Sequence, residues 1–332
     1  MRSHVPAVMN RSLVSDNTSP DRHRVVRAYA PGGIGNLGPG LDILGCAVTG
    51  LGDIVDARFV DTPGVHLEQA GHQSLPVDPA RNAASIAASE VIRKSGGATA
   101  GVALRVTKGL PLSGGQGGSA ASAVAGAVAT NALIGNSLSR LDVLESAYAA
   151  ERTLSGRHID NVAPALFGGI LLIRSVEPFD FDRLPVPPAL RIVLVHPAMQ
   201  LRTAEARAVL PRSVDLDVAV AQAGAVAAMV AAFCTGDLSR LRGAIDDRIA
   251  EPARAPLLPG FDAAKRAALD AGALGCSISG AGPSSFALCD GNDSAEKVCD
   301  AMVAAYRNVG IPSSGRVAEV DQRGARLLGD DE

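Results

Sequence analysis

From Leu110 to Gly135 the chain reads LPLSGGQGGSAASAVAGAVATNALIG, a glycine-rich loop followed directly by small, helix-compatible residues. Gly114, Gly115, Gly117 and Gly118 carry no Cβ, so the backbone can curl and point several N–H groups inward. The N-terminus of the following helix adds the positive end of its dipole. The stretch therefore predicts a loop that binds an anion, most simply a phosphate.

A second interpretation of this stretch involves no ligand. The glycines could form only a tight connection, and the alanines only a closely packed helix. An ordinary P-loop NTPase is disfavoured, because no lysine follows the last glycine, Gly118. Other segments of the chain have to decide between phosphate binding and packing.

Composition narrows the class of protein. The 332 residues suffice for two domains with their own cores, and 47% of them are hydrophobic. A net charge of −3 and 3% aromatic residues give no basic or stacking surface for nucleic acid. The five cysteines form no C-x-x-C pair, which argues against a disulfide framework or a zinc site. We expect a cytoplasmic protein that acts on a small molecule.

Two segments bear on targeting and membranes. Residues 1–24 are polar and lack an apolar core of signal-peptide length, so we expect a disordered extension. The longest apolar stretch, from Val218 to Cys234, is rich in alanine and interrupted by Gln222 and Gly224. It predicts a core helix and no membrane span.

Apolar periodicity predicts a mixed α and β first half, divided from the second half by the proline-rich LPVPP at 184–188. The expected domains are 25–185 and 186–332. Expected strands are 25–29, 54–60, 101–106, 169–174, 191–195, 276–279, 285–288 and one near Val317. Expected helices are 82–95, 119–134, 141–154, 216–234, 238–249, 261–271 and 295–308. This order in the second half predicts a split α/β sandwich.

The segment from Gly33 to Asp42, GIGNLGPGLD, contains the G-x-G-x-x-G spacing of a dinucleotide-binding turn. That turn must open a helix, but a proline and a glycine follow at once at Pro39–Gly40. We therefore interpret GNLGPGLD, from Gly35 to Asp42, as an irregular loop that presents Asn36 and Asp42. A Rossmann-type oxidoreductase is the less favoured alternative.

A polar cluster, His158-Ile-Asp-Asn161, precedes a short apolar helix. Such clusters on loops often carry function, although Asp160 or Asn161 could simply cap the helix. Glu151 lies seven residues upstream, at the end of a helix, and could reach the same cleft. Its alternative role is that of a solvated glutamate.

Two arginines follow loops, Arg207 in TAEARAVLP and Arg254 in EPARAPLLPGF. A guanidinium can hold a carboxylate through two parallel hydrogen bonds, so a pair suits an amino-acid or organic-acid ligand. Surface ion pairs are the alternative. The segment from Ser277 to Ser285 joins two short strands through small residues, which indicates either a tight turn or the close approach of another group to its backbone.

Taken together and in order, these segments resemble the GHMP kinases, and within them the homoserine kinases. NLGPGLD is similar to the first motif of that family, PLSGGQGGSAAS to its ATP loop, and ISGAGPSSFAL to its third motif. HIDNVAPALFGG, TAEARAVLP and EPARAPLLPGF resemble the homoserine kinases in particular. The resemblance runs from about Val25 to the C-terminus.

The resemblance implies an α+β protein of two domains, the first like ribosomal protein S5 domain 2 and the second ferredoxin-like. It implies transfer of phosphate from ATP, with Mg²⁺, to the hydroxyl of L-homoserine, a step towards threonine, and a homodimer. Asp160 and Asn161 would be catalytic, and Glu151 would hold Mg²⁺. Substrate residues would be Asn36, Asp42, His158, Arg207, Arg254 and Gly280. ATP residues would be Asn82, Pro111, Ser113, Gly114, Gly115, Gln116, Gly117, Gly118, Ser119, Ala120 and Ser122.

The chain departs from this family pattern in two loops. Where the family usually reads GLGSSAA, Gln116 replaces the leucine and Gly118 replaces the first serine. In the first motif, PASSAN has become PGGIGN at 31–36. A kinase for another small hydroxylated acid, or a descendant that binds ligands without catalysis, are the alternatives that these departures leave open.

Overall fold

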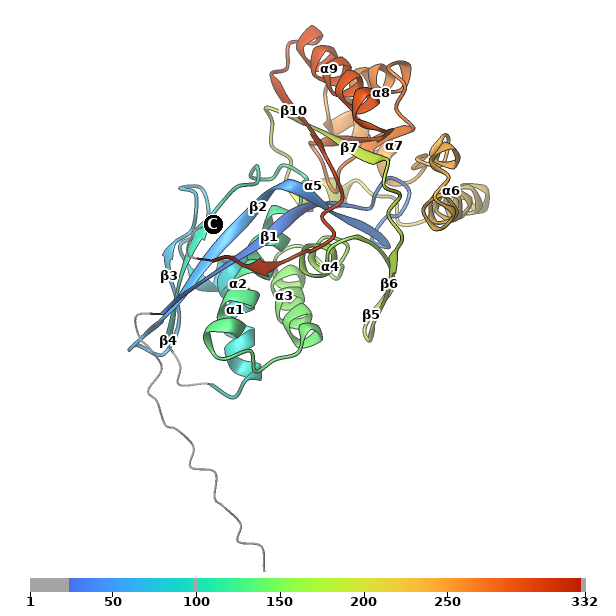
Figure 1. Ribbon diagram of the computed structural model, residues 1–332. Coiled ribbons are helices and arrows are strands. Elements are labelled where there is room, and N and C mark those ends of the chain that lie inside the picture. Colours follow the sequence, from blue (N-terminus) through green and yellow to red (C-terminus); the bar gives the residue numbers. More distant parts are fainter. Residues whose placement is uncertain (1–23, 98–100, 330–332) are drawn as a thin grey trace, which may run out of the picture.

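Two β-sheets organise the molecule, and helices cover both (Figure 1). The computed structural model describes residues 24–97 and 101–329. The expected N-terminal extension lies outside the described residues except for Arg24. The prediction of an α+β protein with two sheet-and-helix parts is confirmed.

The larger sheet has the order β11-β1-β2-β4-β3. In addition, β5 pairs with the N-terminal end of β2, and β6 pairs with β5. Its strands are β1 (Val25–Gly35), β2 (Leu44–Val60), β3 (Gly64–Gln69), β4 (Gly101–Thr107), β5 (Ile170–Val176), β6 (Phe179–Leu184) and β11 (Arg326–Leu327). One face is covered by α1 (Ala83–Lys94), α2 (Gly118–Leu133), α3 (Arg140–Leu154) and α4 (Val162–Phe167), as Figure 1 shows. The 3₁₀ turn η1 (Pro79–Arg81) precedes α1.

The helical layer follows from its sequence. Asn82 caps α1, since its Oδ1 accepts hydrogen bonds from the N–H groups of Ala84 and Ser85. Gly117 precedes α2 with a φ of 70°, a conformation that glycine adopts readily. Alanines make α2 thin and almost wholly buried, so α1, α3 and the sheet pack closely around it. The start of α2 is thereby fixed.

The smaller sheet is antiparallel with the order β10-β7-β9-β8, the arrangement expected of a ferredoxin-like domain. Its strands are β7 (Leu190–Pro197), β8 (Gly275–Ile278), β9 (Ser285–Asp290) and β10 (Ser313–Ala318). Two helices, α8 (Phe261–Asp270) and α9 (Asn292–Asn308), cover it. Other elements are α5 (Thr203–Ala208), α6 (Leu216–Thr235), η2 (Leu238–Leu241), α7 (Ala250–Arg254) and η3 (Ala255–Leu257).

The sheets change near the proline-rich segment, between β6 and β7. The exact boundary at residue 185 stays a prediction, because the C-terminal β11 returns to pair with β1 of the larger sheet. Apolar residues of both parts also share one core cluster, which contains Ile34 and Leu44 as well as Phe286 and Leu288. The two parts are therefore packed against each other.

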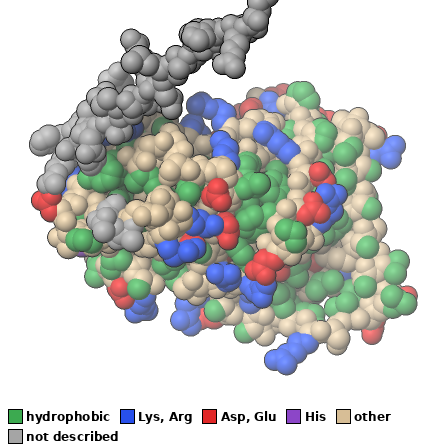
Figure 2. Space-filling view, turned by 90° about the horizontal axis from the view of Figure 1, so that it is seen from below, with side chains coloured by type: hydrophobic (Ala, Val, Ile, Leu, Met, Phe, Trp, Pro, Cys, Tyr) green, Lys and Arg blue, Asp and Glu red, His purple; other side chains and the backbone are tan. Residues whose placement is uncertain are grey.

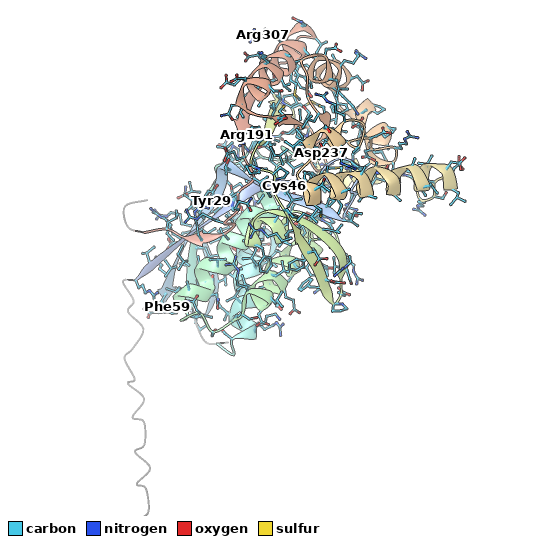
Figure 3. All side chains as sticks on the ribbon, turned by 45° about the vertical axis from the view of Figure 1, so that its right-hand side comes forward. Tyr29, Cys46, Phe59, Arg191, Asp237 and Arg307 are labelled. Carbon is cyan, nitrogen blue, oxygen red and sulfur yellow. The ribbon has the colours of Figure 1, made fainter. Side chains whose placement is uncertain are left out.

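One helix prediction was wrong, and another was right about the helix but only partly right about its burial. The segment 238–249 forms only the 3₁₀ turn η2, because Gly243 takes a φ of 77° and the Asp247 carboxylate caps α7 instead. The helix predicted at 216–234 is present as α6, and its C-terminal part places Met229, Ala232 and Phe233 in the core, whereas most of the helix is not buried. Figure 3 shows much of α6 extending to one side of the molecule. By length and composition α6 alone among the described helices could cross a membrane, and 28% of its most apolar window is buried.

Candidate active site

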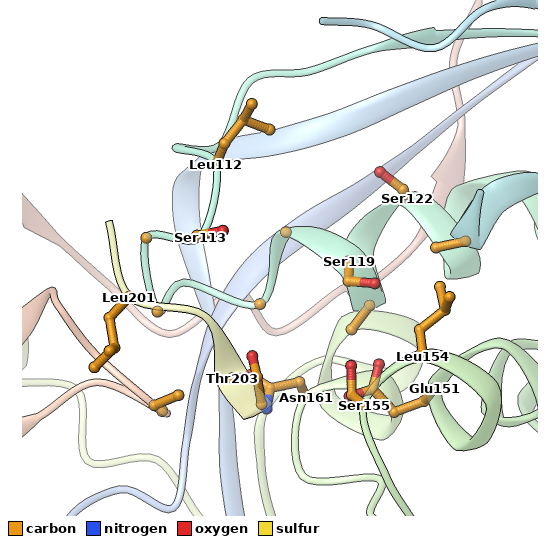
Figure 4. A pocket seen from close by; sticks show the side chains of 18 of the residues that line it. Leu112, Ser113, Ser119, Ser122, Glu151, Leu154, Ser155, Asn161, Leu201 and Thr203 are labelled. Atoms are coloured by element: carbon orange, nitrogen blue, oxygen red, sulfur yellow. The ribbon is translucent and has the colours of Figure 1, made fainter. Parts of the chain in front are cut away.

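A cleft of about 270 Å³ lies between the two parts of the molecule, where the start of α2 meets the loops of the smaller sheet. Figure 4 shows side chains from α2, α3 and the segment before α5 around it. Figure 2 shows the molecule from below, with arginines, lysines and carboxylates mixed over that face. The structure brings almost all of the predicted site residues to the cleft wall. They are Asn36, Asp42, Asn82, Pro111, Ser113, Gly114, Gly115, Gly117, Gly118, Ser119, Ala120, Ser122, Glu151, His158, Asp160, Asn161, Arg207, Arg254 and Gly280.

The glycine loop is held from behind by the hairpin loop at 279–284. Ser279 Oγ donates to Gly115 O at 2.7 Å, and Ser284 N donates to Gly114 O at 3.2 Å. Two carbonyl groups of the loop are thus engaged away from the cleft. Residues of the loop and of the first turn of α2 line the cleft, and the N-terminus of a helix is a suitable place for a phosphate. The interpretation of 277–285 as a tight turn is confirmed, and the glycine loop approaches its backbone closely at Gly115. Approach of a ligand to this turn stays a prediction.

A lysine that sequence reasoning missed stands at the start of α2. Lys108 Nζ donates to Gly118 O at 2.9 Å and to Ser122 Oγ at 3.0 Å, and it forms an ion pair with the buried Asp53. Asp53 also accepts from Ser122 Oγ at 2.6 Å. Lys108 precedes the glycine loop, so the usual search for a lysine after the last glycine does not find it. A charged residue within the apolar alternation of β2 was the available signal for Asp53.

The loop after β1 is organised by Asp160. Its Oδ2 accepts from the N–H of Asn36 at 3.1 Å, and Asn36 Nδ2 in turn donates to Gly280 O at 3.0 Å. Gly35 is required here, because a Cβ at this position would clash with the Asp160 carboxylate. The prediction of an irregular loop in place of a dinucleotide-binding helix is confirmed, and Asn36 and Asp42 line the cleft.

The two predicted arginines lie in the same cleft with different partners. Arg207 forms a two-point ion pair with Asp42, at 2.5 and 3.3 Å. Arg254 is 3% exposed and donates only to backbone carbonyls, from Nε to Ala206 O at 3.1 Å and from Nη1 to Gly280 O at 2.9 Å. Burial and the nearby Arg207 lower the pKa of Arg254. Within residues 24–97 and 101–329, Arg254 has no carboxylate partner, so an anionic ligand would complete its surroundings.

Three titratable groups, Glu151, His158 and Asp160, are buried at the floor of the cleft. His158 Nδ1 lies 3.2 Å from Asp160 Oδ1 and 3.5 Å from Glu151 Oε1, distances of ion pairs without hydrogen-bond alignment. Burial raises the pKa of Glu151 to about 7. Burial opposes protonation of His158, but the Asp160 and Glu151 carboxylates outweigh it and raise the His158 pKa. The floor of the cleft therefore holds a carboxyl that is only half ionised near neutral pH.

The donor set can be compared with the needs of Mg²⁺, which prefers oxygen ligands. Glu151 offers a buried carboxylate on α3, and Ser119 at the start of α2 lies across the same space in Figure 4. A cation there would stabilise the ionised carboxylate of Glu151 and so lower its pKa, which burial raises. Asp42, His158 and Asp160 also have ligand atoms within 4.8 Å of one another, but Asp42 is paired with Arg207 and an imidazole does not suit Mg²⁺. Glu151 is the better candidate.

Glu151→Gln is expected to flatten the dependence of stability on pH in the absence of Mg²⁺. A folded-state pKa near 7, against the ordinary glutamate pKa of 4.5, makes folding bind a proton, so stability is lost as pH rises from about 4.5 to 7. The loss is about 3 kcal/mol if the full shift is expressed. Thermal unfolding between pH 5 and 8 measures it, with the exposed Glu145→Gln on the same helix as control. An unchanged slope in Glu151→Gln would contradict the assignment.

Gln116 is the one predicted ATP residue that the structure does not place on the cleft wall. Its side chain is buried and turns behind the loop, towards Ser284 and Arg316. Further lining residues escaped prediction. They are Leu75, Pro76, Arg81, Ala83, Lys108, Leu112, Leu154, Ser155, Leu201, Thr203, Ala281 and Gly282. Of these, Thr203 begins the TAEAR segment that was singled out for Arg207, so its position in that segment was an available signal.

Comparison with known proteins gives one consistent result. Residues 82–169 match the family model of the GHMP kinases N terminal domain, and residues 229–308 match that of the GHMP kinases C terminal. The homoserine kinase of Chlorobium phaeobacteroides is 40% identical over 92% of this chain and 100% of its own length. That of Arabidopsis thaliana is 42% identical over 91% of this chain and 84% of its own. The crystal structure of homoserine kinase from Cytophaga hutchinsonii superposes with a TM-score of 0.88 at 41% identity, covering 92% of this chain and 97% of the other.

Proposed function

Since this chain belongs to the GHMP kinase family, among the homoserine kinases, we propose how its cleft phosphorylates the hydroxyl of L-homoserine with ATP. The enzyme is a phosphotransferase with an alcohol acceptor. One observation carries the assignment of roles: the glycine loop and both guanidinium groups line the same cleft. An anion site and an amino-acid site therefore lie within reach of each other.

For the acceptor, Arg254 and Arg207 would bind the carboxylate and Asp42 the ammonium group. The existing pair of Arg207 with Asp42 supports this assignment, because a zwitterion offers one opposite charge to each of them. Asn36, Gly280 and His158 complete this end of the cleft. Substrate binding would then exchange a protein ion pair for two ion pairs with ligand, and Arg254 would gain a carboxylate partner.

For the donor, the glycine loop from Pro111 to Ser122 would hold the phosphates of ATP, with Asn82 on the nucleoside side. Because Asn82 Oδ1 is already used to cap α1, its Nδ2 is the group left to donate to the nucleotide. Lys108 adds a positive charge beside the loop, although Asp53 partly neutralises it. Glu151 would hold Mg²⁺, which neutralises phosphate charge when bound.

Asp160 would accept the proton of the homoserine hydroxyl. Its Oδ1 is buried and, among the described residues, has no hydrogen-bond partner, so it retains accepting capacity. Asn161 Nδ2 lies 3.3 Å from Asp160 Oδ2 and steadies the carboxylate. Most of the catalysis would come from positioning and charge neutralisation, since phosphoryl transfer needs little covalent help from the protein.

A coupled assay of ADP release, with ATP, Mg²⁺ and L-homoserine, tests this function. We expect turnover that depends on homoserine, and inhibition without turnover by 2-aminobutyrate, which lacks the hydroxyl. L-Serine and L-threonine serve as competing acceptors. Preference for another hydroxy acid would move the proposal to that substrate, and ligand binding without ADP release would refute a kinase. A homodimer in the cytoplasm is also proposed, and gel filtration tests the dimer.

A further inference from the structure

Gln116 occupies the position where the related ATP loops usually have leucine, and it is buried with 4% of its surface exposed. Its side-chain Nε2 donates to Ser284 Oγ at 3.1 Å, and its Oε1 accepts from Arg316 Nη2 at 3.3 Å. Its backbone carbonyl accepts from the N–H of Gly33 at 3.1 Å. One residue of the loop is thus bonded to three separate segments. A leucine could form only the backbone bond.

The partners of Gln116 belong mainly to the smaller sheet. Ser284 immediately precedes β9 and Arg316 lies on β10, whereas the loop itself continues into α2 of the larger part. His196, on β7, places its Nδ1 3.1 Å from Ser284 Oγ. Burial lowers the pKa of His196, so the neutral ring can accept the Ser284 proton while Ser284 accepts from Gln116. Each contact of this hydrogen-bond network therefore has one donor and one acceptor. Arg316 donates to Gln116, Gln116 donates to Ser284, and Ser284 donates to His196.

Arg316 makes this hydrogen-bond network sensitive to the loss of the Gln116 side-chain amide. Its Nη1 donates to Thr49 O at 2.6 Å, and its buried Nε has no partner among the described residues. Burial lowers its pKa, and no carboxylate of the described residues lies within ion-pair distance. Removing the Gln116 oxygen would leave a second donor of this cation, Nη2, without its partner.

We propose that Gln116 is a positioning residue, which fixes the phosphate loop against the smaller sheet through Ser284 and Arg316. It does not contact the nucleotide. Its hydrogen bonds hold the loop so that the N–H groups on the opposite side remain directed into the cleft. This inference rests on the proposed function only in naming ATP as the anion, and it deepens that function by assigning loop geometry to a residue outside the cleft.

The test compares Gln116→Leu with the parent enzyme. We expect the Kd and KM for ATP to rise about tenfold, in line with loss of buried hydrogen bonds, and kcat to fall, while the KM for homoserine changes less than about twofold. Ser284→Ala should reproduce this split, and the double variant should lose no more than the worse single variant. Ser284→Ala keeps the proposal testable if Gln116→Leu does not fold.

Asn131→Ala is the matched control. Asn131 is also a buried amide on α2, and it bridges to Leu138 by two hydrogen bonds far from the cleft. It should lower the Tm without changing the KM for ATP. If Gln116→Leu likewise lowers only the Tm, or weakens both substrates equally, the inference is overturned. ATP binding measured by calorimetry separates it from the proposed function, because absence of homoserine turnover in the parent would leave the ATP measurement intact.

Discussion

Arg254→Ala is expected to raise the KM for homoserine about 100- to 1000-fold and to leave the KM for ATP within about threefold, since a buried charge-assisted contact is worth several kcal/mol. The guanidinium is almost wholly buried, and its hydrogen bonds to Ala206 O and Gly280 O fix its direction. Arg207 would still reach the ligand carboxylate, but it also pairs with Asp42, whereas Arg254 has no carboxylate partner among the described residues. Steady-state kinetics with each substrate varied in turn measures the split.

Two further variants make the result specific to this guanidinium. Arg254→Lys keeps a positive charge but loses the planar fork, so it should recover little of the affinity. Arg202→Ala, an exposed arginine beside α5 that pairs with Glu205, should have almost no effect. Equal losses for homoserine and ATP in Arg254→Ala would contradict a carboxylate-binding role. A large fall in Tm would instead indicate that its backbone hydrogen bonds are mainly structural.

Local sequence patterns predicted most of this cleft, because its walls are short loops with their own chemistry. The glycine loop before α2 and the polar segment 158–161 each lie within a few residues of the helix that positions them. Helix starts were equally visible, as Asn82 before α1 illustrates. Where a loop or a helix start depends on nearby residues, the local sequence pattern was sufficient to predict it.

Features that depend on distant residues could not be predicted in this way. The return of β11 to β1, and the ion pair of Lys108 with Asp53 across 55 positions, leave no local periodicity. β1 extends through the glycines to Gly35 because β2 pairs with it across a bulge at Pro31–Gly32. Taken alone, the glycines at 32–35 indicate a loop. They form a strand because β2 pairs with them. The direction of the Gln116 side chain depends in the same way on Ser284, 168 residues away.

Asp160→Asn is expected to lower kcat about 1000-fold, within the usual range for loss of a general base. Asp160 is 3% exposed, and one of its oxygens holds Asn36 while the other faces His158 without a hydrogen bond. The amide of an asparagine can preserve the contact to Asn36 through its oxygen but cannot take up a proton. The KM values for ATP and homoserine should therefore stay within about threefold while kcat falls.

The effects on kcat and KM distinguish a general base from a residue that only holds the loop at Asn36. If Asp160 served only to hold the loop at Asn36, the asparagine would preserve that contact and kcat would stay within about tenfold, because the bound γ-phosphate and metal alone would orient the alcohol. Asp321→Asn provides the control, since Asp321 is also buried but caps the turn at 321–324, outside the cleft. It should lower stability and leave both kinetic constants unchanged. The same kcat loss in Asp321→Asn would mean that buried carboxylates act on turnover through stability, and the base assignment would fall.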